Sequence, residues 1–128
     1  MIKLLFIDDS QAEVILIKEF FKRSPDLKDV QLDAWAGPAS LADTDSYDGV
    51  IIDQYLENGE TGLEFAASLR SYDWLKPIML YTGDKCLPED SLVFVDQVCD
   101  KNDFMGFSVA LNAFIMQIKR IKFLKQHQ

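Results

Sequence analysis

The 128-residue sequence contains few cysteines, fewer basic than acidic residues, and no long hydrophobic run. Its two cysteines, Cys86 and Cys99, stand apart and outside any cluster of histidine and cysteine, which argues against a disulfide and against a zinc site. Thirteen Lys and Arg residues stand against 21 acidic ones, for a formal net charge of -8, so most of the surface would repel a nucleic-acid backbone. We therefore expect reduced thiols and no bound nucleic acid.

The sequence pattern also gives no sign of a membrane span or of a signal peptide. No apolar run approaches the roughly 20 residues of a membrane span, and the opening segment from Met1 to Asp8 is too short and too soon charged for a signal peptide. The length and the 48% hydrophobic content suit one compact domain over residues 1–128, without repeats or linkers. We expect a cytoplasmic protein with no membrane partner.

Strand-like apolar runs alternate with helical patterns along the whole chain. This alternation predicts an α/β fold, in which a doubly wound parallel sheet carries helices on both faces. The predicted strands are residues 3–7, 30–35, 48–52, 77–81 and 97–99. The predicted helices are residues 10–24, 61–71 and 103–121, with a short helix over Ala39 to Ala42 and a short or irregular one within Cys86 to Asp96.

Capping patterns mark where the helices begin. Ser10 with Glu13, and Thr61 with Glu64, match capping boxes, and Asp103 is placed to cap the last helix. The first helix is predicted to bury the stripe Ala12, Ile15, Leu16, Phe20 and Phe21. The second is predicted to bury Leu63, Phe65, Ala66 and Leu69, and the last Phe104, Phe107, Leu111, Phe114, Ile118 and Ile121. We interpret these aromatic and aliphatic residues as core, not as a cofactor site.

Three aspartates stand where predicted strands end. Asp8 and Asp9 follow the first strand and Asp53 follows the third, while Thr82 and Lys101 follow the fourth and fifth. The carboxyl ends of parallel strands meet at one edge of the sheet, so these side chains should gather there. Packed carboxylates need a counter-charge such as a divalent cation, and without one at least one pKa should rise. Taken singly, each residue suits a turn, a helix cap or the surface, but together they predict a phosphorylation site.

This ordered set of five residues resembles the two-component response-regulator receiver domains, which are CheY-like, over essentially the whole chain. The resemblance implies a flavodoxin-like sheet in the order 2-1-3-4-5 and a phosphoacceptor at Asp53. It implies Mg²⁺, or Mn²⁺ in its place, bound by Asp9 and Asp53, by Asp8 through water, and by the backbone carbonyl of Tyr55. Thr82 and Lys101 would hold the phosphoryl oxygens.

The implied activity is signalling, and not turnover of a substrate. Asp53 would attack the phosphorus of a phosphohistidine, on a histidine kinase or phosphotransfer protein, or of a small phosphodonor. The domain would assist its own phosphorylation and dephosphorylation and act through an unidentified downstream protein. The resemblance also allows a dimer that forms on phosphorylation.

Four positions set this chain apart within the resemblance. Asn102 follows Lys101 where proline is usual, so we expect a trans peptide bond there. Val98 replaces the aromatic residue that turns inward in many receivers. Tyr55 is expected to shield the acyl phosphate from water more strongly than Asp84 promotes its hydrolysis, which predicts a long lifetime. Without a switching aromatic, the segment from Cys86 to Asp96 is expected to rearrange.

Two other classes of function were weighed. A phosphorylation-independent interaction module fits Val98 and Asn102, but gives the acids and Lys101 no purpose. An enzyme on a similar sheet fits less well. An aspartate-nucleophile phosphatase would have acids one residue apart, and a flavin protein would have a phosphate loop where Asp8 and Asp9 repel phosphate.

Overall fold

The computed structural model describes residues 1–37, 40, 42–56 and 59–127. Within these residues five strands form one parallel sheet in the order β2-β1-β3-β4-β5, which confirms the predicted fold class and strand order. The strands are β1 (Ile2–Ile7), β2 (Val30–Trp35), β3 (Gly49–Asp53), β4 (Ile78–Thr82) and β5 (Gln97–Asp100). The described helices are α1 (Gln11–Lys22), η1 (Pro25–Leu27), η2 (Ala42–Ser46), α2 (Gly62–Ser71), η3 (Glu89–Phe94) and α3 (Phe104–Gln126), where η marks a 3₁₀ helix.

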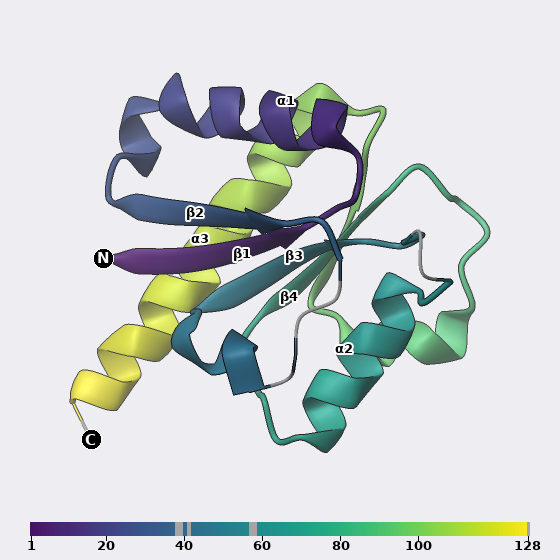
Figure 1. Cartoon of the computed structure of the whole chain (residues 1–128). Coiled ribbons are helices and arrows are strands. Elements are labelled where there is room, and N and C mark those ends of the chain that lie inside the picture. The colour runs from purple at the N-terminus through teal and green to yellow at the C-terminus, as the bar shows by residue number, and fades with distance from the viewer. Residues whose placement is uncertain (38–39, 41, 57–58, 128) are drawn as a thin grey trace.

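Helices cover both faces of the sheet, as predicted (Figure 1). Helices α1 and α3 pack on one face, where they enclose alternate strand residues such as Leu4, Phe6 and Met79. Helix α2 and the residues around η3 pack on the other face, against neighbours such as Leu5 and Leu80. Successive strand side chains point to opposite faces, so β1, β3 and β4 contribute to both cores.

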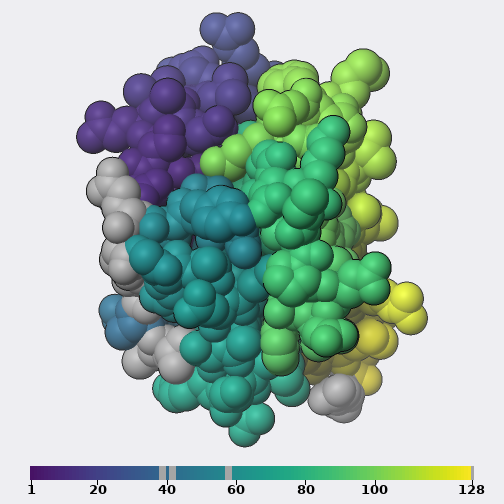
Figure 2. Space-filling view, turned by 90° about the vertical axis from the view of Figure 1, so that its right-hand side faces the viewer, coloured from purple at the N-terminus to yellow at the C-terminus, as the bar shows by residue number. Residues whose placement is uncertain are grey.

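The register brings the carboxyl ends of the strands to one edge. Ile7 pairs with Ile52 and Trp35, so β1 ends beside both of its neighbours. Thr82 pairs with Asp100 at the ends of β4 and β5. In Figure 1 the strands point toward the right, and Figure 2 looks onto that side, where the segments that follow them come together. Residues after four of the strands therefore share one surface.

Two of the links between strands contain a 3₁₀ helix but no α-helix among the described residues. The described part of the link between β2 and β3 holds only η2, and the link between β4 and β5 holds only η3. The short or irregular helix expected within Cys86 to Asp96 is therefore confirmed. Of the helix expected over Ala39 to Ala42, residues 39 and 41 lie outside the described residues, as do Pro38 and the loop residues Glu57 and Asn58.

The predicted caps are present on all three α-helices. The Ser10 hydroxyl accepts a hydrogen bond from the Glu13 backbone N–H at 3.4 Å, and the Thr61 hydroxyl accepts one from Glu64 at 3.1 Å. The Asp103 carboxylate accepts a bond from the Gly106 backbone N–H at 2.8 Å. Each cap satisfies an N–H that the first helical turn leaves without a partner.

Part of the predicted apolar stripe of α1 was wrong. Ala12 is exposed, and Ile15 and Leu16 are 63% and 47% exposed, whereas Ile17 and Phe21 are buried. The apolar run from residue 14 to 17 is continuous, so its sequence fits two helical phases, and only packing on the sheet selects the one that buries Ile17. The prediction that Phe104 is buried was also wrong, because its side chain is 59% exposed and contacts the edge of the core.

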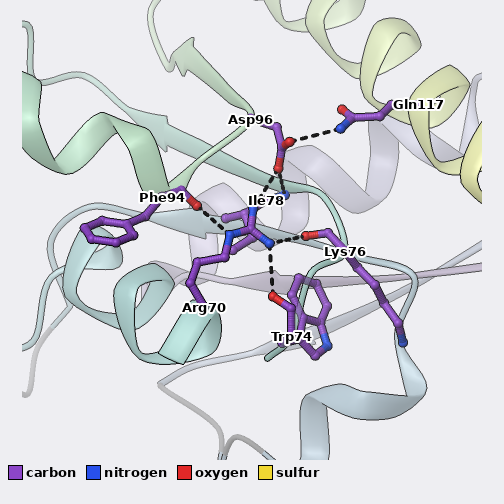
Figure 3. Close-up of polar contacts among 7 residues, drawn as sticks. All are labelled: Arg70, Trp74, Lys76, Ile78, Phe94, Asp96 and Gln117. Carbon is purple, nitrogen blue, oxygen red and sulfur yellow. Dashed lines mark hydrogen bonds and ion pairs between the residues drawn. The ribbon is translucent and has the colours of Figure 1, made fainter. Parts of the chain in front are cut away.

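A network of half-buried ions joins elements at the amino-terminal end of the sheet (Figure 3). The Arg70 guanidinium of α2 forms an ion pair with Asp96 at 2.9 Å, just before β5. The same group donates three hydrogen bonds to backbone carbonyls, those of Phe94 (3.1 Å), Trp74 (3.0 Å) and Lys76 (2.7 Å). Arg70 thus ties α2 to the segment that leads into β4 and to the end of η3.

Asp96 extends the network to β4 and α3. Its carboxylate accepts hydrogen bonds from the Ile78 backbone N–H at 2.8 Å and from the Gln117 side-chain amide at 2.9 Å. The Asp96 backbone N–H donates in turn to the Ile78 carbonyl at 2.8 Å. One carboxylate therefore fixes the start of two strands relative to both helical layers.

The described residues include no helix that combines the length and apolar character needed to cross a membrane.

Candidate functional site

The three aspartates singled out in the sequence meet at the carboxyl edge of the sheet. One carboxylate oxygen of each of Asp8, Asp9 and Asp53 lies within 4.8 Å of the others. Asp8 and Asp53 are buried, at 1% and 8% exposure, and Asp9 is half-buried. Asp8 is further held by the Ser10 backbone N–H, which donates to one of its oxygens at 2.9 Å.

Lys101 contacts two of these acids. Its Nζ lies 3.1 Å from Oδ2 of Asp8 and 3.1 Å from Oδ1 of Asp53. Its backbone N–H donates to the Thr82 carbonyl at 3.2 Å, which places the residue directly after β5. The cation also lies 5.3 Å from the centre of the Tyr81 ring, a distance at which the ring face attracts it. Lys101 therefore balances part of the negative charge of the cluster.

The electrostatics of the cluster favour a proton or a cation near Asp53. Burial raises the pKa of Asp53, the hydrogen bond from Lys101 opposes that rise, and the charge of Asp8 adds to it. Burial works to lower the pKa of Lys101, but its contacts with Asp53 and Asp8 outweigh that effect and the pKa is raised. Lys101 therefore stays charged, and a metal ion would compete with protonation of Asp53.

Thr82 is the last residue of β4, and Asp84 lies in the loop that follows it. Thr82 is 3% exposed, and its hydroxyl accepts a hydrogen bond from the Asp84 backbone N–H at 3.1 Å. The Asp84 carboxylate accepts one from the Cys86 backbone N–H at 2.8 Å. It also accepts a hydrogen bond from the hydroxyl of Tyr55, in the loop after β3. The two loops that flank the acids are thus joined by a side-chain contact.

Two residues that the sequence analysis missed shape the loop after Asp53. The side-chain oxygen of buried Gln54 accepts a hydrogen bond from the Leu63 backbone N–H at 3.1 Å, and its carbonyl accepts one from Gly62 at 2.8 Å. A Cβ on Gly62 would collide with the backbone carbonyl of Asp53. Glycine at the start of an apolar helix, just past an acidic strand end, was the available sequence signal for this close approach.

Tyr81 was also missed as part of the site. Its ring is buried and packs edge-on against Phe6 and Phe107, with centroid distances of 5.9 Å and 5.4 Å. Its hydroxyl donates to the Glu13 carboxylate at 3.2 Å, and burial, with that contact, raises the pKa of the phenol. Its position inside an apolar strand gave no sign that Lys101 would lie over its ring.

Val98 lies on the outer side of the edge strand β5 and is 46% exposed. With Thr82, Leu87 and Leu92 it lines a cavity of about 380 Å³ between η3 and β5. The Lys101–Asn102 peptide bond is trans, as expected, since the described residues contain no cis bond. The space beside Thr82 is therefore bordered by aliphatic side chains and by charged ones such as Asp84 and Lys85.

The donor set suits a hard divalent cation. Mg²⁺ takes oxygen ligands in octahedral geometry and keeps several waters, and three carboxylates within reach of one point supply the right atoms. One further oxygen ligand is expected from the sequence, the backbone carbonyl of Tyr55, two positions after Asp53. The described residues include no cluster of histidine, cysteine and acids other than this one that could hold a metal.

No protein-family model matches the chain, and no curated protein matches it as a relative. The chain is similar to solved structures of receiver domains. The response regulator TrrA from Thermotoga maritima, in complex with Mg²⁺-BeF, is 23% identical with a TM-score of 0.74, over 89% of this chain and 99% of that one. The Francisella response regulator 1452 receiver domain is 19% identical with a TM-score of 0.76, over 94% and 99%.

A CheY-like receiver domain from Methylobacillus flagellatus is 23% identical with a TM-score of 0.68, over 89% of this chain and 98% of that one. The likeness spans nearly the full length of each neighbour. The chain has the fold of the CheY-like response-regulator receiver domains.

Proposed function

We propose that this protein is a signalling receiver that accepts a phosphoryl group on Asp53. The observation that carries the proposal is the contact of Lys101 with both Asp8 and Asp53 at 3.1 Å, at the edge of the sheet where Thr82 also lies. A single surface lysine or strand-end aspartate would be ordinary. A buried acid pair that shares one cation beside a third acid and a hydroxyl has the parts that phosphoryl transfer requires.

Mg²⁺, with Mn²⁺ as a substitute, is the proposed cofactor. Asp9 and Asp53 would bind it directly, Asp8 through water, and Tyr55 through its backbone carbonyl. The metal would neutralise charge on the transferred group. The Thermotoga neighbour was solved with Mg²⁺-BeF, which supports the same chemistry for this chain.

The protein's own residues have distinct roles in the proposed transfer. A carboxylate oxygen of Asp53 attacks phosphorus, the bond from phosphorus to the donor nitrogen breaks, and the imidazole leaves with that electron pair. Lys101 moves its contact from Asp53 to a phosphoryl oxygen, because the attacking carboxylate oxygen loses its negative charge when it forms the P–O bond of the acyl phosphate. In the structure the Thr82 hydroxyl accepts a hydrogen bond from the Asp84 backbone N–H. The same hydroxyl can donate a hydrogen bond to another phosphoryl oxygen.

The proposed partners follow from the donor chemistry. A histidine kinase or a phosphotransfer protein would supply the phosphohistidine, and a downstream protein would bind the phosphorylated form. The domain spans residues 1–128 in this proposal and acts in the cytoplasm, without binding nucleic acid.

Intact-mass measurement tests phosphorylation directly. The protein is incubated with acetyl phosphate and Mg²⁺, and a mass gain of one phosphoryl group is expected. Asp53→Asn should show no gain, because the nucleophile is lost, whereas Asp26→Asn, at an exposed aspartate of η1, should retain it. A gain that persists in Asp53→Asn would contradict the assignment of the phosphoacceptor.

The second candidate is an interaction module that works without phosphorylation. The half-exposed Val98 favours it, because this side chain cannot make the inward turn of a large aromatic. The mass measurement separates the two, because a module that works without phosphorylation would gain no phosphoryl group from acetyl phosphate and Mg²⁺.

A further inference from the structure

The outer face of α3 carries an apolar stripe that no other described element covers. Its four members are Met105, Val109, Met116 and Phe123, which are 80%, 71%, 65% and 57% exposed. With the exposed Asn112 and Lys119 they follow alternating steps of four and three residues, the spacing that keeps side chains along one line of a helix. The stripe is about 27 Å long at 1.5 Å per residue.

This stripe is separate from the face that α3 gives to the core. The buried residues Phe107, Leu111, Phe114 and Ile118 repeat at the same spacing and pack on the sheet beside α1. Met105, Val109 and Met116 each lie two residues from a buried one, and at 100° per residue the two lines are on broadly opposite sides of the helix. Helix α3 is therefore apolar on two sides, and only one is used within the chain.

Charge is distributed unevenly along the same helix. The sequence from Phe104 to Ile118 contains no charged residue. Asp100 and Asp103 lie just before it, whereas Lys119 and Arg120 follow it and are exposed. The uncharged part of α3, from Phe104 to Ile118, is thus bordered by acids at its start and by cations at its end.

We propose that α3 pairs with α3 of a second copy of this chain, antiparallel, through this stripe. A two-fold axis near residues 112–114 places Val109 opposite Met116 of the other copy, and Met105 near its Arg120. The cations of each copy then lie within about one helical turn of the acids of the other. A parallel pair would bring like charges together at both ends, and the helix dipoles also favour the antiparallel arrangement.

A second copy suits the stripe better than an unrelated helix. The required partner has an uncharged apolar line of equal length with acids at one end and cations at the other, and the chain itself has that pattern. The stripe and its charges involve none of the residues proposed to bind metal or phosphate. The dimer therefore does not rest on the proposed function, and Asp53→Asn should retain it.

Sedimentation equilibrium of the full chain over a range of concentrations tests the pairing. We expect a monomer–dimer equilibrium that Met116→Lys weakens by about tenfold or more, because it places an unpaired cation against Val109 of the other copy on each side of the two-fold axis. Ile15→Lys, at an exposed apolar residue of α1, is the matched control and should leave the equilibrium unchanged. Thermal unfolding of both variants verifies that each folds.

Disulfide trapping tests the antiparallel orientation. In a Cys86→Ser background, Asn112→Cys should form a disulfide-linked dimer under mild oxidation, because it lies beside the two-fold axis. Phe123→Cys should not, because its counterpart lies at the other end of the seam. A chain that stays monomeric, a dimer that Met116→Lys leaves intact, or efficient trapping through position 123 would each overturn the proposal. A monomer that instead binds anionic lipid vesicles through the stripe would overturn it as well.

Discussion

The hydroxyl of Tyr55 donates a hydrogen bond to the carboxylate of Asp84. Tyr55 stands two residues after Asp53, and Asp84 stands two residues after Thr82, so the contact joins the loops on either side of the acids. The bond raises the pKa of the Tyr55 phenol and lowers the pKa of the Asp84 carboxyl. The sequence suggested that these two residues act in opposite directions on hydrolysis, but in the structure they form one unit.

Separating this pair should shorten the lifetime of the acyl phosphate. Tyr55→Phe keeps the ring but releases the Asp84 carboxylate, and Tyr55→Asn also removes the ring. We expect hydrolysis to become faster in that order, by about tenfold for Tyr55→Asn, since in-line attack by water needs an open approach. The decay of the phosphorylated mass measures the rate, and Tyr72→Phe, at an exposed tyrosine after α2, is the control. Unchanged or slower hydrolysis in Tyr55→Asn would refute the shielding.

Loss of Lys101 should destabilise the metal-free protein. Lys101→Met leaves buried Asp8 and Asp53 without their shared cation, and we expect the free energy of unfolding at pH 7 to fall by about 2–3 kcal/mol. Millimolar Mg²⁺ should restore more stability to this variant than it adds to the wild type, as urea denaturation can show. Lys85→Met is the control, because Lys85 is 80% exposed and 4.0 Å from Asp100. Equal losses in the two variants would argue against a special role for Lys101.

The raised pKa of Asp53 predicts that stabilisation by Mg²⁺ depends on pH. A carboxyl whose pKa is higher in the folded state takes up a proton on folding, so its contribution to stability is present at low pH. That contribution is lost as the pH rises through the folded pKa, which lies above the ordinary 3.8. Because Mg²⁺ binds the carboxylate, the gain in melting temperature from Mg²⁺ should grow over the same pH range. A gain that is independent of pH would contradict this coupling.

Gly62 should tolerate no side chain. In Gly62→Ala the new Cβ meets the backbone carbonyl of Asp53, which cannot move without shifting β3, and we expect a loss of about 2–3 kcal/mol. Gly37→Ala is the matched control, because no atom lies within 4 Å of a Cβ there. Chemical denaturation of both variants measures the difference. If Gly62→Ala is as stable as Gly37→Ala, the tight approach of α2 to Asp53 is wrong.

Arg70 should contribute far more than an exposed arginine. Arg70→Met removes the cation that pairs with Asp96 and the guanidinium donor of three backbone carbonyls, which we expect to cost about 2–4 kcal/mol of unfolding free energy. Arg23→Met removes a pair with Glu19 whose side chains are 83% and 48% exposed, so its effect should be near zero. Urea unfolding compares the two, and similar losses would contradict the network's importance.

The sheet and the acid cluster were predictable because each rests on a local pattern with one geometric outcome. Apolar runs that alternate with capped helices specify a parallel sheet, and parallel strands bring their carboxyl ends together. The positions of Asp8, Asp9 and Asp53 follow from those two facts without knowledge of any loop. The proximity of Lys101 followed in the same way, because β5 ends beside β4.

The remaining features depend on tertiary contacts that leave no mark in the sequence. Ile15 and Ile17 are equally apolar, and only the angle of α1 on the sheet decides which is buried. Arg70 and Asp96 resemble ordinary surface charges until α2 and β5 are packed. The bond between Tyr55 and Asp84 requires the shapes of two loops, which no periodicity specifies.

The network around Arg70 has a consequence for how the molecule opens. It pins Phe94 and Asp96 at the end of the sheet farthest from the acids, whereas the near end of the segment from Gly83 to Leu92 is held by the more exposed contacts of Asp84. We expect amide protons near Asp96 to exchange slowly with solvent, at close to the rate of global unfolding, and those near Gly83 to exchange through small local openings. Transient exposure would then begin beside Thr82 and fade toward Phe94, which makes the loop next to the chemistry the part of the fold that opens first.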